Sequence, residues 1–310
     1  MNFKLLTVIL FLFSLISTVF AGEKNKITEP LGSSQFILMD DAVKLHVVNW
    51  GGEGVHLIFL AGLSLNAHTF DFLAQSFTST FQVIGVTRAG HGLSDPRTKD
   101  FSIARQVKDI VRVLDRLNIE RAVFVGHSIA GAELTYLGKH FPKRVKGLIY
   151  LDALQDLDYV GSHVAACPDN GYTKIDLTEH KEHFYKTQRS ISNDGSYMPF
   201  ADLNTLGELL KAEAEYDRDY TDIKAPALAI NHIPEQTRDF FFGMFQPSQS
   251  CIEEINKLTY LGIANFIKNK ANADVAAIQN SQHMIHMANP DKLTEIMHNW
   301  LVRNVIESEE

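Results

Sequence analysis

Among its 310 residues the chain has only two cysteines, Cys167 and Cys251, and fewer basic residues than acidic ones. The formal net charge of −8 argues against a nucleic-acid partner, because such proteins present a basic surface to the phosphates. Internal repeats, low-complexity tracts and long blocks of like charge are also missing from the sequence. His163 and Cys167 have a ligand-like spacing, but nothing nearby completes a ligand set, so no metal site is expected.

Residues 1–21 differ from the rest of the chain. Lys4 is their only charge, Leu5 to Phe20 is almost entirely apolar, and the small residue Ala21 precedes a charged stretch. This pattern predicts a secretory signal peptide cut after Ala21, and therefore a secreted or periplasmic protein without a stable membrane span. An uncleaved anchor is the alternative, but the apolar run is shorter than the roughly 20 residues that cross a bilayer. In a secreted chain the two cysteines can form a disulfide, and two buried thiols are the alternative.

Short apolar runs alternate with helical patterns along most of the chain. Apolar residues recur at helical spacing from Ile103 to Leu117, and Pro290 is typical of the first position of a helix. The runs expected to be strands lie at residues 34–50 (two strands), 56–60, 82–86, 121–125, 145–151, 225–231 and 274–279. This alternation predicts an α/β domain with a mostly parallel sheet flanked by helices. Residues 153–222 break the pattern and are expected to form a helical lid, inserted between core segments 22–152 and 223–310.

The run GHSIAG at residues 126–131 lies between an expected buried strand and a helix-like segment. A nucleophilic serine needs a sharp turn that exposes its hydroxyl, and small residues two before and two after it leave room for that turn. Gly126 and Ala130 occupy these two positions around Ser128. Ser128 is therefore the candidate nucleophile, and a purely structural strand-to-helix turn is the alternative.

Five motifs stand in an order that resembles the α/β-hydrolase superfamily over about residues 34–306. They are FLAGLS (59–64), TRAGHGLS (87–94), GHSIAG (126–131), APALAIN (225–231) and HMIHMANP (283–290). The resemblance implies the α/β-hydrolase fold and a triad in which an imidazole, oriented by a carboxylate, takes the proton of the serine. It assigns the imidazole to His283, and the oxyanion-binding N–H groups to Ile129 and Leu63.

The resemblance leaves the acid open between two residues. Family members usually carry it in the loop after the strand APALAIN, and the corresponding position, counted from Pro226, is Glu235. Most members have Asp there, although a Glu carboxylate can orient the imidazole equally. Asp152, at the end of the preceding expected strand, is the alternative, because some superfamily members place the acid there. A structural role in capping the loop backbone would also explain Asp152.

The resemblance and the motifs together predict a secreted serine hydrolase that cleaves small carboxylic esters or lactones through an acyl-enzyme. Neither a cofactor nor a metal is required, and a small-molecule ester is the expected partner. Ser128 argues against epoxide and haloalkane hydrolases of this fold, which use an Asp nucleophile. The alternatives are an aminopeptidase-like enzyme, a hydrolase of C–C bonds, or a non-catalytic binding protein on the same scaffold.

Overall fold

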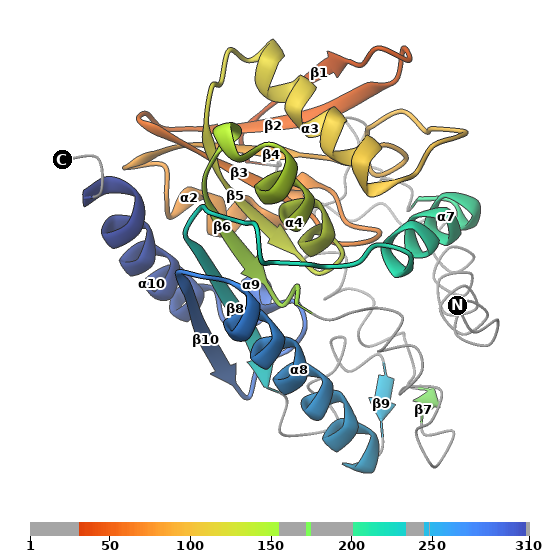
Figure 1. Cartoon of the computed structure of the whole chain (residues 1–310). Helices are drawn as coiled ribbons and strands as arrows, with labels where there is room; N and C mark the ends of the chain where they lie inside the picture. Colours follow the sequence, from red (N-terminus) through yellow and green to blue (C-terminus); the bar gives the residue numbers. More distant parts are fainter. Residues whose placement is uncertain (1–30, 155–171, 175–200, 234–244, 248, 308–310) are drawn as a thin grey trace.

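The computed structural model describes residues 31–154, 172–174, 201–233, 245–247 and 249–307. An eight-stranded sheet forms the centre of this part, in the order β1-β2-β4-β3-β5-β6-β8-β10 (Figure 1). Its strands are β1 (Ser33–Leu38), β2 (Lys44–Gly51), β3 (Val55–Leu60), β4 (Phe81–Val86), β5 (Ala122–His127), β6 (Val145–Leu151), β8 (Ala227–Ile233) and β10 (Ala273–Gln279). Only the β1–β2 and β2–β4 pairs of this sheet are antiparallel. The mostly parallel sheet predicted from the sequence is thus confirmed.

Helices cover both faces of the sheet (Figure 1). Those that pack on one face are α3 (Ile103–Arg116), α4 (Ala130–His140) and α8 (Gln249–Asn269). Those on the other face are η1 (Ala67–Phe70), α2 (Asp71–Gln75), α9 (Ile285–Ala288) and α10 (Pro290–Leu301). The short helices η2 (Pro142–Arg144) and η5 (Val302–Ile306) precede β6 and follow α10. The sheet is therefore buried on both sides, as nearly continuous apolar strands require.

Helix α3 shows why the periodic pattern in the sequence was informative. The Ser102 hydroxyl caps its start by accepting a hydrogen bond from the Arg105 N–H at 3.2 Å. Val107, Ile110 and Leu114 form one apolar stripe and are buried against the sheet. Helix α8 was not expected from the sequence, yet it spans Gln249–Asn269 and packs on β8 and β10.

Two described elements lie within the residues assigned to the lid. Helix α7 (Leu203–Ala214) is capped by Asp202, and its Thr205 lies against Gly90 in the loop after β4. Strand β7 (Tyr172–Lys174) pairs antiparallel with β9 (Phe245–Pro247), which comes after β8 in the chain. The lid boundaries themselves stay a prediction, because much of 153–222 lies outside the described residues.

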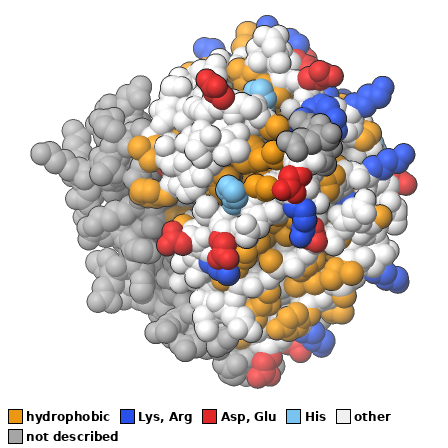
Figure 2. All heavy atoms as spheres, turned by 90° about the vertical axis from the view of Figure 1, so that its left-hand side faces the viewer, with side chains coloured by type: hydrophobic (Ala, Val, Ile, Leu, Met, Phe, Trp, Pro, Cys, Tyr) orange, Lys and Arg blue, Asp and Glu red, His pale blue; other side chains and the backbone are white. Residues whose placement is uncertain are grey.

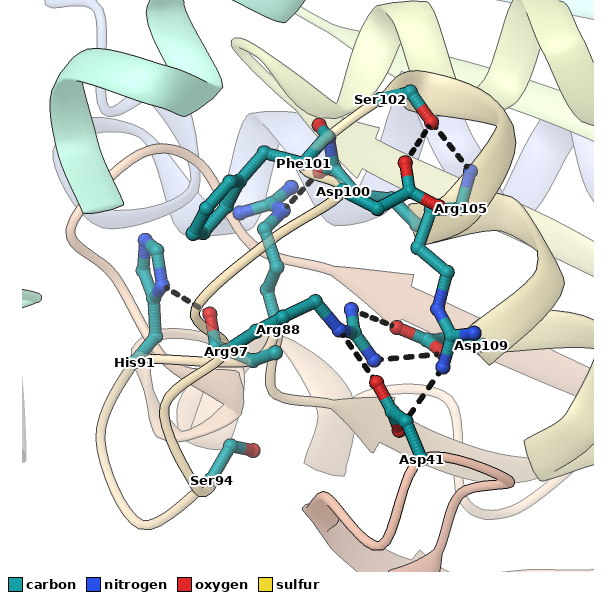
Figure 3. Close-up of polar contacts among 12 residues, drawn as sticks. Asp41, Arg88, His91, Ser94, Arg97, Asp100, Phe101, Ser102, Arg105 and Asp109 are labelled. Carbon is teal, nitrogen blue, oxygen red and sulfur yellow. Dashed lines mark hydrogen bonds and ion pairs between the residues drawn. The ribbon is translucent and has the colours of Figure 1, made fainter. Parts of the chain in front are cut away.

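An ion-pair network joins the β1–β2 turn to helix α3 (Figure 3). Arg97 places Nη1 2.6 Å from Oδ2 of Asp109, and its Nε lies 3.0 Å from Oδ2 of Asp41. Arg105 contacts both carboxylates at 3.0 Å. Burial raises the pKa of Asp109, although the Arg97 guanidinium acts in the opposite direction. This network fastens the β1–β2 turn to helix α3, and it includes none of the residues at the strand ends described below.

On the face shown in Figure 2, acidic, basic and apolar side chains are interspersed. None of the helices in the described residues combines the length and the apolar character needed to cross a bilayer. The expected signal segment, residues 1–21, lies outside the described residues, as does Cys167. Cys251 lies on α8, but its side chain is not among those described.

Candidate active site

Ser128 occupies the turn between β5 and α4. Its φ of 57° lies in the left-handed region, which costs an ordinary residue roughly 1–2 kcal/mol. The turn is held by a 3.1 Å hydrogen bond from the Ser128 N–H to the carbonyl of Leu151 at the end of β6. Gly131 is required because a Cβ there would lie 2.0 Å from the Ala153 carbonyl oxygen. The chain thus folds into the strained elbow that a nucleophilic serine needs.

Two further side chains meet Ser128 at the carboxyl edge of the sheet. Nε2 of His283 lies 2.9 Å from the Ser128 hydroxyl, and Nδ1 of the same ring lies 2.5 Å from Oδ2 of Asp152. Ser128 follows β5, Asp152 follows β6 and His283 follows β10, so parallel strand ends bring together three distant residues. This is the geometry of a nucleophile, a base and an orienting acid.

Asp152 is fully buried and is held by strand β8. Its φ of 46° is left-handed, and its N–H donates to the Ile230 carbonyl at 2.7 Å. Burial alone would disfavour the carboxylate, but His232 and His283 outweigh it and keep the pKa of Asp152 well below its usual range. The acid is therefore ionised throughout the pH range in which imidazole titrates.

His232 is a site residue that the sequence reasoning missed. Its Nδ1 lies 2.7 Å from Oδ2 of Asp152, and its backbone N–H donates to Oδ1 at 3.3 Å. The expected strand ended at Asn231, whereas β8 continues to Ile233 and carries His232 to the end of β6. A histidine directly after the apolar run APALAIN was the sequence signal for this residue, because the carboxyl ends of inner parallel strands face the site.

Potential metal ligands meet at this site, where atoms of Asp152, His232 and His283 lie within 4.8 Å of one another. Both Nδ1 atoms approach one carboxylate oxygen at 2.5 and 2.7 Å. Ligands around a tetrahedral zinc ion at about 2.1 Å would be roughly 3.4 Å apart. The spacing is therefore that of two imidazoles in direct contact with a carboxylate, and the described geometry gives no reason to assign a metal there.

Two other histidines support the loop that carries His283. His127 places Nε2 3.0 Å from the His283 carbonyl oxygen, and His286 places Nε2 3.0 Å from the Thr69 hydroxyl. Burial lowers the pKa of His127 well below its usual value and that of His286 to about 3. Both rings are therefore neutral at physiological pH and act as supports rather than as charges.

The loop after β3 brings Leu63 to the nucleophile. A Cβ at Gly62 would lie 2.7 Å from His127 Nδ1 and 3.2 Å from Ser128 Cβ, so glycine allows this close approach. In the described part of the chain, the N–H groups of Leu63 and Ile129 take no part in the hydrogen bonds of turns and loops. They remain available to an oxyanion.

Arg88 ties this loop to helix α4, a connection that the sequence did not reveal. Its guanidinium makes two bonds to Glu133, of 2.8 and 2.9 Å, and both side chains are buried. It also donates to the carbonyls of Ala61 at 3.1 Å and Gly62 at 3.4 Å. Because C=O and N–H of one trans peptide point in opposite directions, holding the Gly62 carbonyl also fixes the direction of the Leu63 N–H.

Glu235, the favoured acid in the sequence analysis, lies outside the described residues. Among the described carboxylates, Asp152 is the one bonded to His283. His91 is buried in the loop after β4, with Nδ1 3.2 Å from the Ala89 carbonyl oxygen.

Comparison with known proteins identifies the fold. A family model described as alpha/beta hydrolase fold matches residues 55–169. The solved structure of E-2-(acetamidomethylene)succinate hydrolase is 17% identical and aligns with a TM-score of 0.63 over 87% of this chain and 98% of that chain. The chain has the α/β-hydrolase fold. Est816, described as an N-acyl homoserine lactone degrading enzyme, aligns with this chain at a TM-score of 0.60 and 22% identity, covering 86% of this chain and all of Est816.

Sequence similarity to the curated relatives is confined to part of the chain. A putative non-heme haloperoxidase of Mycobacterium phage D29 is 33% identical over 103 residues, which cover 33% of this chain and 37% of that protein. The chain thus matches about a third of the length of its first curated relatives. These similarities establish the fold, and the activity is argued below from the site.

Proposed function

We propose that this α/β hydrolase is a serine hydrolase that cleaves small carboxylic esters or lactones. The observation that carries the proposal is the chain of contacts from Ser128 through His283 to Asp152. A buried, ionised carboxylate keeps the imidazole in the tautomer whose unprotonated Nε2 faces the serine hydroxyl. The neighbouring unengaged N–H groups of Ile129 and Leu63 supply what the developing oxyanion needs.

The first half of the reaction forms an acyl-enzyme. Ser128 Oγ attacks the ester carbonyl carbon while Nε2 of His283 takes the hydroxyl proton. The carbonyl electrons move to oxygen, where the Ile129 and Leu63 N–H groups stabilise the negative charge. As the tetrahedral carbon collapses, the C–O bond to the leaving group breaks and the imidazolium returns the proton to the departing alkoxide.

The second half regenerates the serine. A water molecule gives a proton to Nε2 of His283 and attacks the acyl carbon of the ester formed with Ser128. Collapse breaks the bond to Oγ, which recovers the proton, and the carboxylic acid leaves. Asp152 stays ionised in both halves and stabilises the imidazolium that forms each time.

The proposed substrate class rests on the serine site and on related structures. Est816 is described as degrading an N-acyl homoserine lactone, which is a cyclic ester. Small esters and lactones require only an acyl pocket and the oxyanion donors, and no group that binds a free amine. The aromatic-rich segment 153–222 is proposed to cover the site as a lid and to select the acyl group.

Hydrolysis of p-nitrophenyl esters of increasing acyl length tests the proposal on the purified, expressed chain. Ser128→Ala should abolish the activity. Ser76→Ala, at an exposed serine that follows helix α2, should leave it unchanged. Activity that survives Ser128→Ala would contradict the proposal. Wild-type inactivity on all esters and lactones, with cleavage of aminoacyl amides or diketones, would instead favour the peptidase or the C–C hydrolase.

We further propose that the chain is exported and that Cys167 and Cys251 are joined. The lone basic residue and apolar run before Ala21 support export, and an oxidising compartment would permit the disulfide. Mass spectrometry of the exported protein should find Gly22 at its N-terminus. Non-reducing peptide mapping should find the two cysteines in one linked fragment, and a retained leader or two alkylated thiols would overturn the respective statement.

A further inference from the structure

The carboxylate of Asp152 is shared between two imidazoles. His283 and His232 both direct Nδ1 at the same oxygen, Oδ2, at 2.5 and 2.7 Å. The triad described above needs only His283 in this position. His232 is 1% exposed, its ring centre is 6.0 Å from that of His283, and the imidazole in contact with the Ser128 hydroxyl is that of His283.

We propose that His232 is a positioning residue that fixes the Asp152 carboxylate and limits how strongly this carboxylate supports the His283 imidazolium. The inference rests on the proposed hydrolase function of the same site. His232 itself touches neither the substrate nor the reacting atoms, and it acts only through Asp152.

The hydrogen-bonding capacity of His232 defines its role. Nδ1 of His232 lies 2.7 Å from Oδ2 of the ionised Asp152, so this nitrogen carries a proton, although its N–H is not aligned for a hydrogen bond with Oδ2. Nε2 of the same ring is buried and has no hydrogen-bond partner among the described residues. A second proton on Nε2 would be a buried donor without an acceptor, which costs about 1–3 kcal/mol. His232 therefore acts as a neutral, single-proton donor.

A neutral donor has two effects on the carboxylate. Together with the backbone N–H of residue 232 on Oδ1, it fixes the rotation of a side chain whose backbone is in a strained left-handed conformation. It also draws electron density from Oδ2, the oxygen that stabilises positive charge on His283. Removing this donor should leave the carboxylate freer to stabilise the imidazolium, while making its orientation less certain.

Among the described residues, two other imidazoles near His283 are the groups that could produce the same effect. His127 at the end of β5 and His286 on α9 are the other imidazoles in contact with or next to it. Burial lowers the pKa of both, so neither changes charge between pH 6 and 9. A change in the pH profile on substitution of His232 can therefore be assigned to its bond with Asp152.

Two substitutions of His232 distinguish the effect of its N–H on Asp152 from the effect of its side-chain volume. His232→Phe keeps a planar ring and removes both nitrogens. His232→Asn places an amide N–H near the Nδ1 position and can restore the bond to Oδ2. His91→Phe is the matched control, because His91 is equally buried and its ring nitrogen contacts the Ala89 carbonyl instead of the triad.

The experiment compares the pH profiles of kcat/KM for these variants with p-nitrophenyl acetate. We expect His232→Phe to move the acid limb upward by about one pH unit and to lower kcat about ten-fold, with KM little changed. His232→Asn should restore the wild-type acid limb, and His91→Phe should not move it. A wild-type acid limb in His232→Phe, with only a lower melting temperature, would show a structural role and overturn the inference.

A second readout does not depend on turnover. NMR titration of 15N-labelled histidine in the Ser128→Ala background follows the protonation of His283 directly. We expect the His232→Phe substitution to move that titration upward and to shift the Nδ1 proton of His283 downfield. If the titration moves but no variant hydrolyses esters, the inference stands and the proposed function fails. If neither moves, the inference is wrong, whatever the activity.

Discussion

Two buried aspartates make contrasting use of the same chemical group. Asp152 is 0% exposed and is bonded to two imidazoles at the carboxyl edge of the sheet. Asp109 is 6% exposed and is bonded to Arg97 and Arg105 on the flank of the molecule (Figure 3). The partners of Asp109 are permanently charged guanidiniums, whereas the partners of Asp152 are imidazoles, the side chain most often used for proton transfer.

The difference teaches where a buried charge can serve chemistry. A guanidinium locks its carboxylate in place and has no proton to exchange, so the Asp109 network can only hold the turn near Asp41 to helix α3. An imidazole that contacts the carboxylate through one ring nitrogen can still accept or release a proton at its other ring nitrogen. The geometry around Asp152 therefore stores its negative charge beside a group, His283, that can become positive during a reaction.

The largest expected effect comes from neutralising the carboxylate at the strand ends. Asp152→Asn should lower kcat by about 10³–10⁴-fold, because the amide donates to Nδ1 and holds the imidazole in the unproductive tautomer. Glu235→Gln should leave kcat within a few-fold of wild type. Steady-state ester hydrolysis measures both variants, and the opposite pattern would assign the acid to Glu235.

The matching change on the flank should damage stability instead. Arg97→Met leaves the buried Asp109 carboxylate with Arg105 as its remaining ion-pair partner. This should lower the free energy of unfolding by about 3–5 kcal/mol. Urea denaturation measures this loss, and the specific activity of the folded protein should not change. Lys292→Ala is the control, because Lys292 and Glu295 form an exposed pair whose loss should cost less than about 1 kcal/mol. An activity loss in Arg97→Met without a stability loss would break the comparison.

The sequence specified the fold better than it specified the site. The apolar runs predicted the strands of the eight-stranded sheet and the extent of α3 to within two residues at each end, because both depend on local periodicity. It did not specify the acid, because the choice depends on which strand ends lie beside His283. That choice follows from the lateral order β6-β8-β10, which no local pattern encodes.

The supporting residues were out of reach for the same reason. Arg88 and Glu133 lie on different elements and meet only after β4 and α4 pack. His232 depends on β8 continuing past the expected end of the strand. Short motifs locate a nucleophile, whereas the groups that orient its neighbours come from tertiary packing.

A third buried carboxylate, Glu133, provides an intermediate case. Its partner is a guanidinium, as for Asp109. That partner, Arg88, also donates to the Ala61 carbonyl and so holds the loop after β3, which carries the Leu63 N–H. The double variant Arg88→Met, Glu133→Leu removes both charges and avoids an unpaired one. We expect kcat to fall about 10–100-fold with KM little changed, because the Leu63 N–H loses its fixed direction.

The measurement for this variant includes the affinity for a boronic acid that mimics the tetrahedral intermediate. That affinity should weaken in parallel with kcat, because both depend on the oxyanion donors. Unchanged affinity for the boronic acid, with lower kcat, would exclude a role in the oxyanion loop.

The smallest expected effect concerns imidazoles that are buried without a carboxylate. Burial lowers the pKa of His91 and of His286 to about 3, so the unfolded chain binds protons that the folded chain does not. Stability should therefore fall as pH falls below about 6.5, by about 2 kcal/mol for each ring at pH 5. Urea midpoints at pH 8 and pH 5 measure this fall. His91→Phe should reduce the dependence, and a pH-independent midpoint would contradict the argument.

The contact of His283 with Asp152 has a consequence for how such a protein can diversify. The nucleophile and this carboxylate follow adjacent strands, β5 and β6, and both lie within the stretch 55–169 that the family model matches. If Asp152 is the acid, the segment after β8, where relatives of this fold usually keep theirs, does not have to preserve a catalytic residue. Under the proposed function, sequence changes after β8 can alter the choice of substrate without touching the nucleophile or its acid.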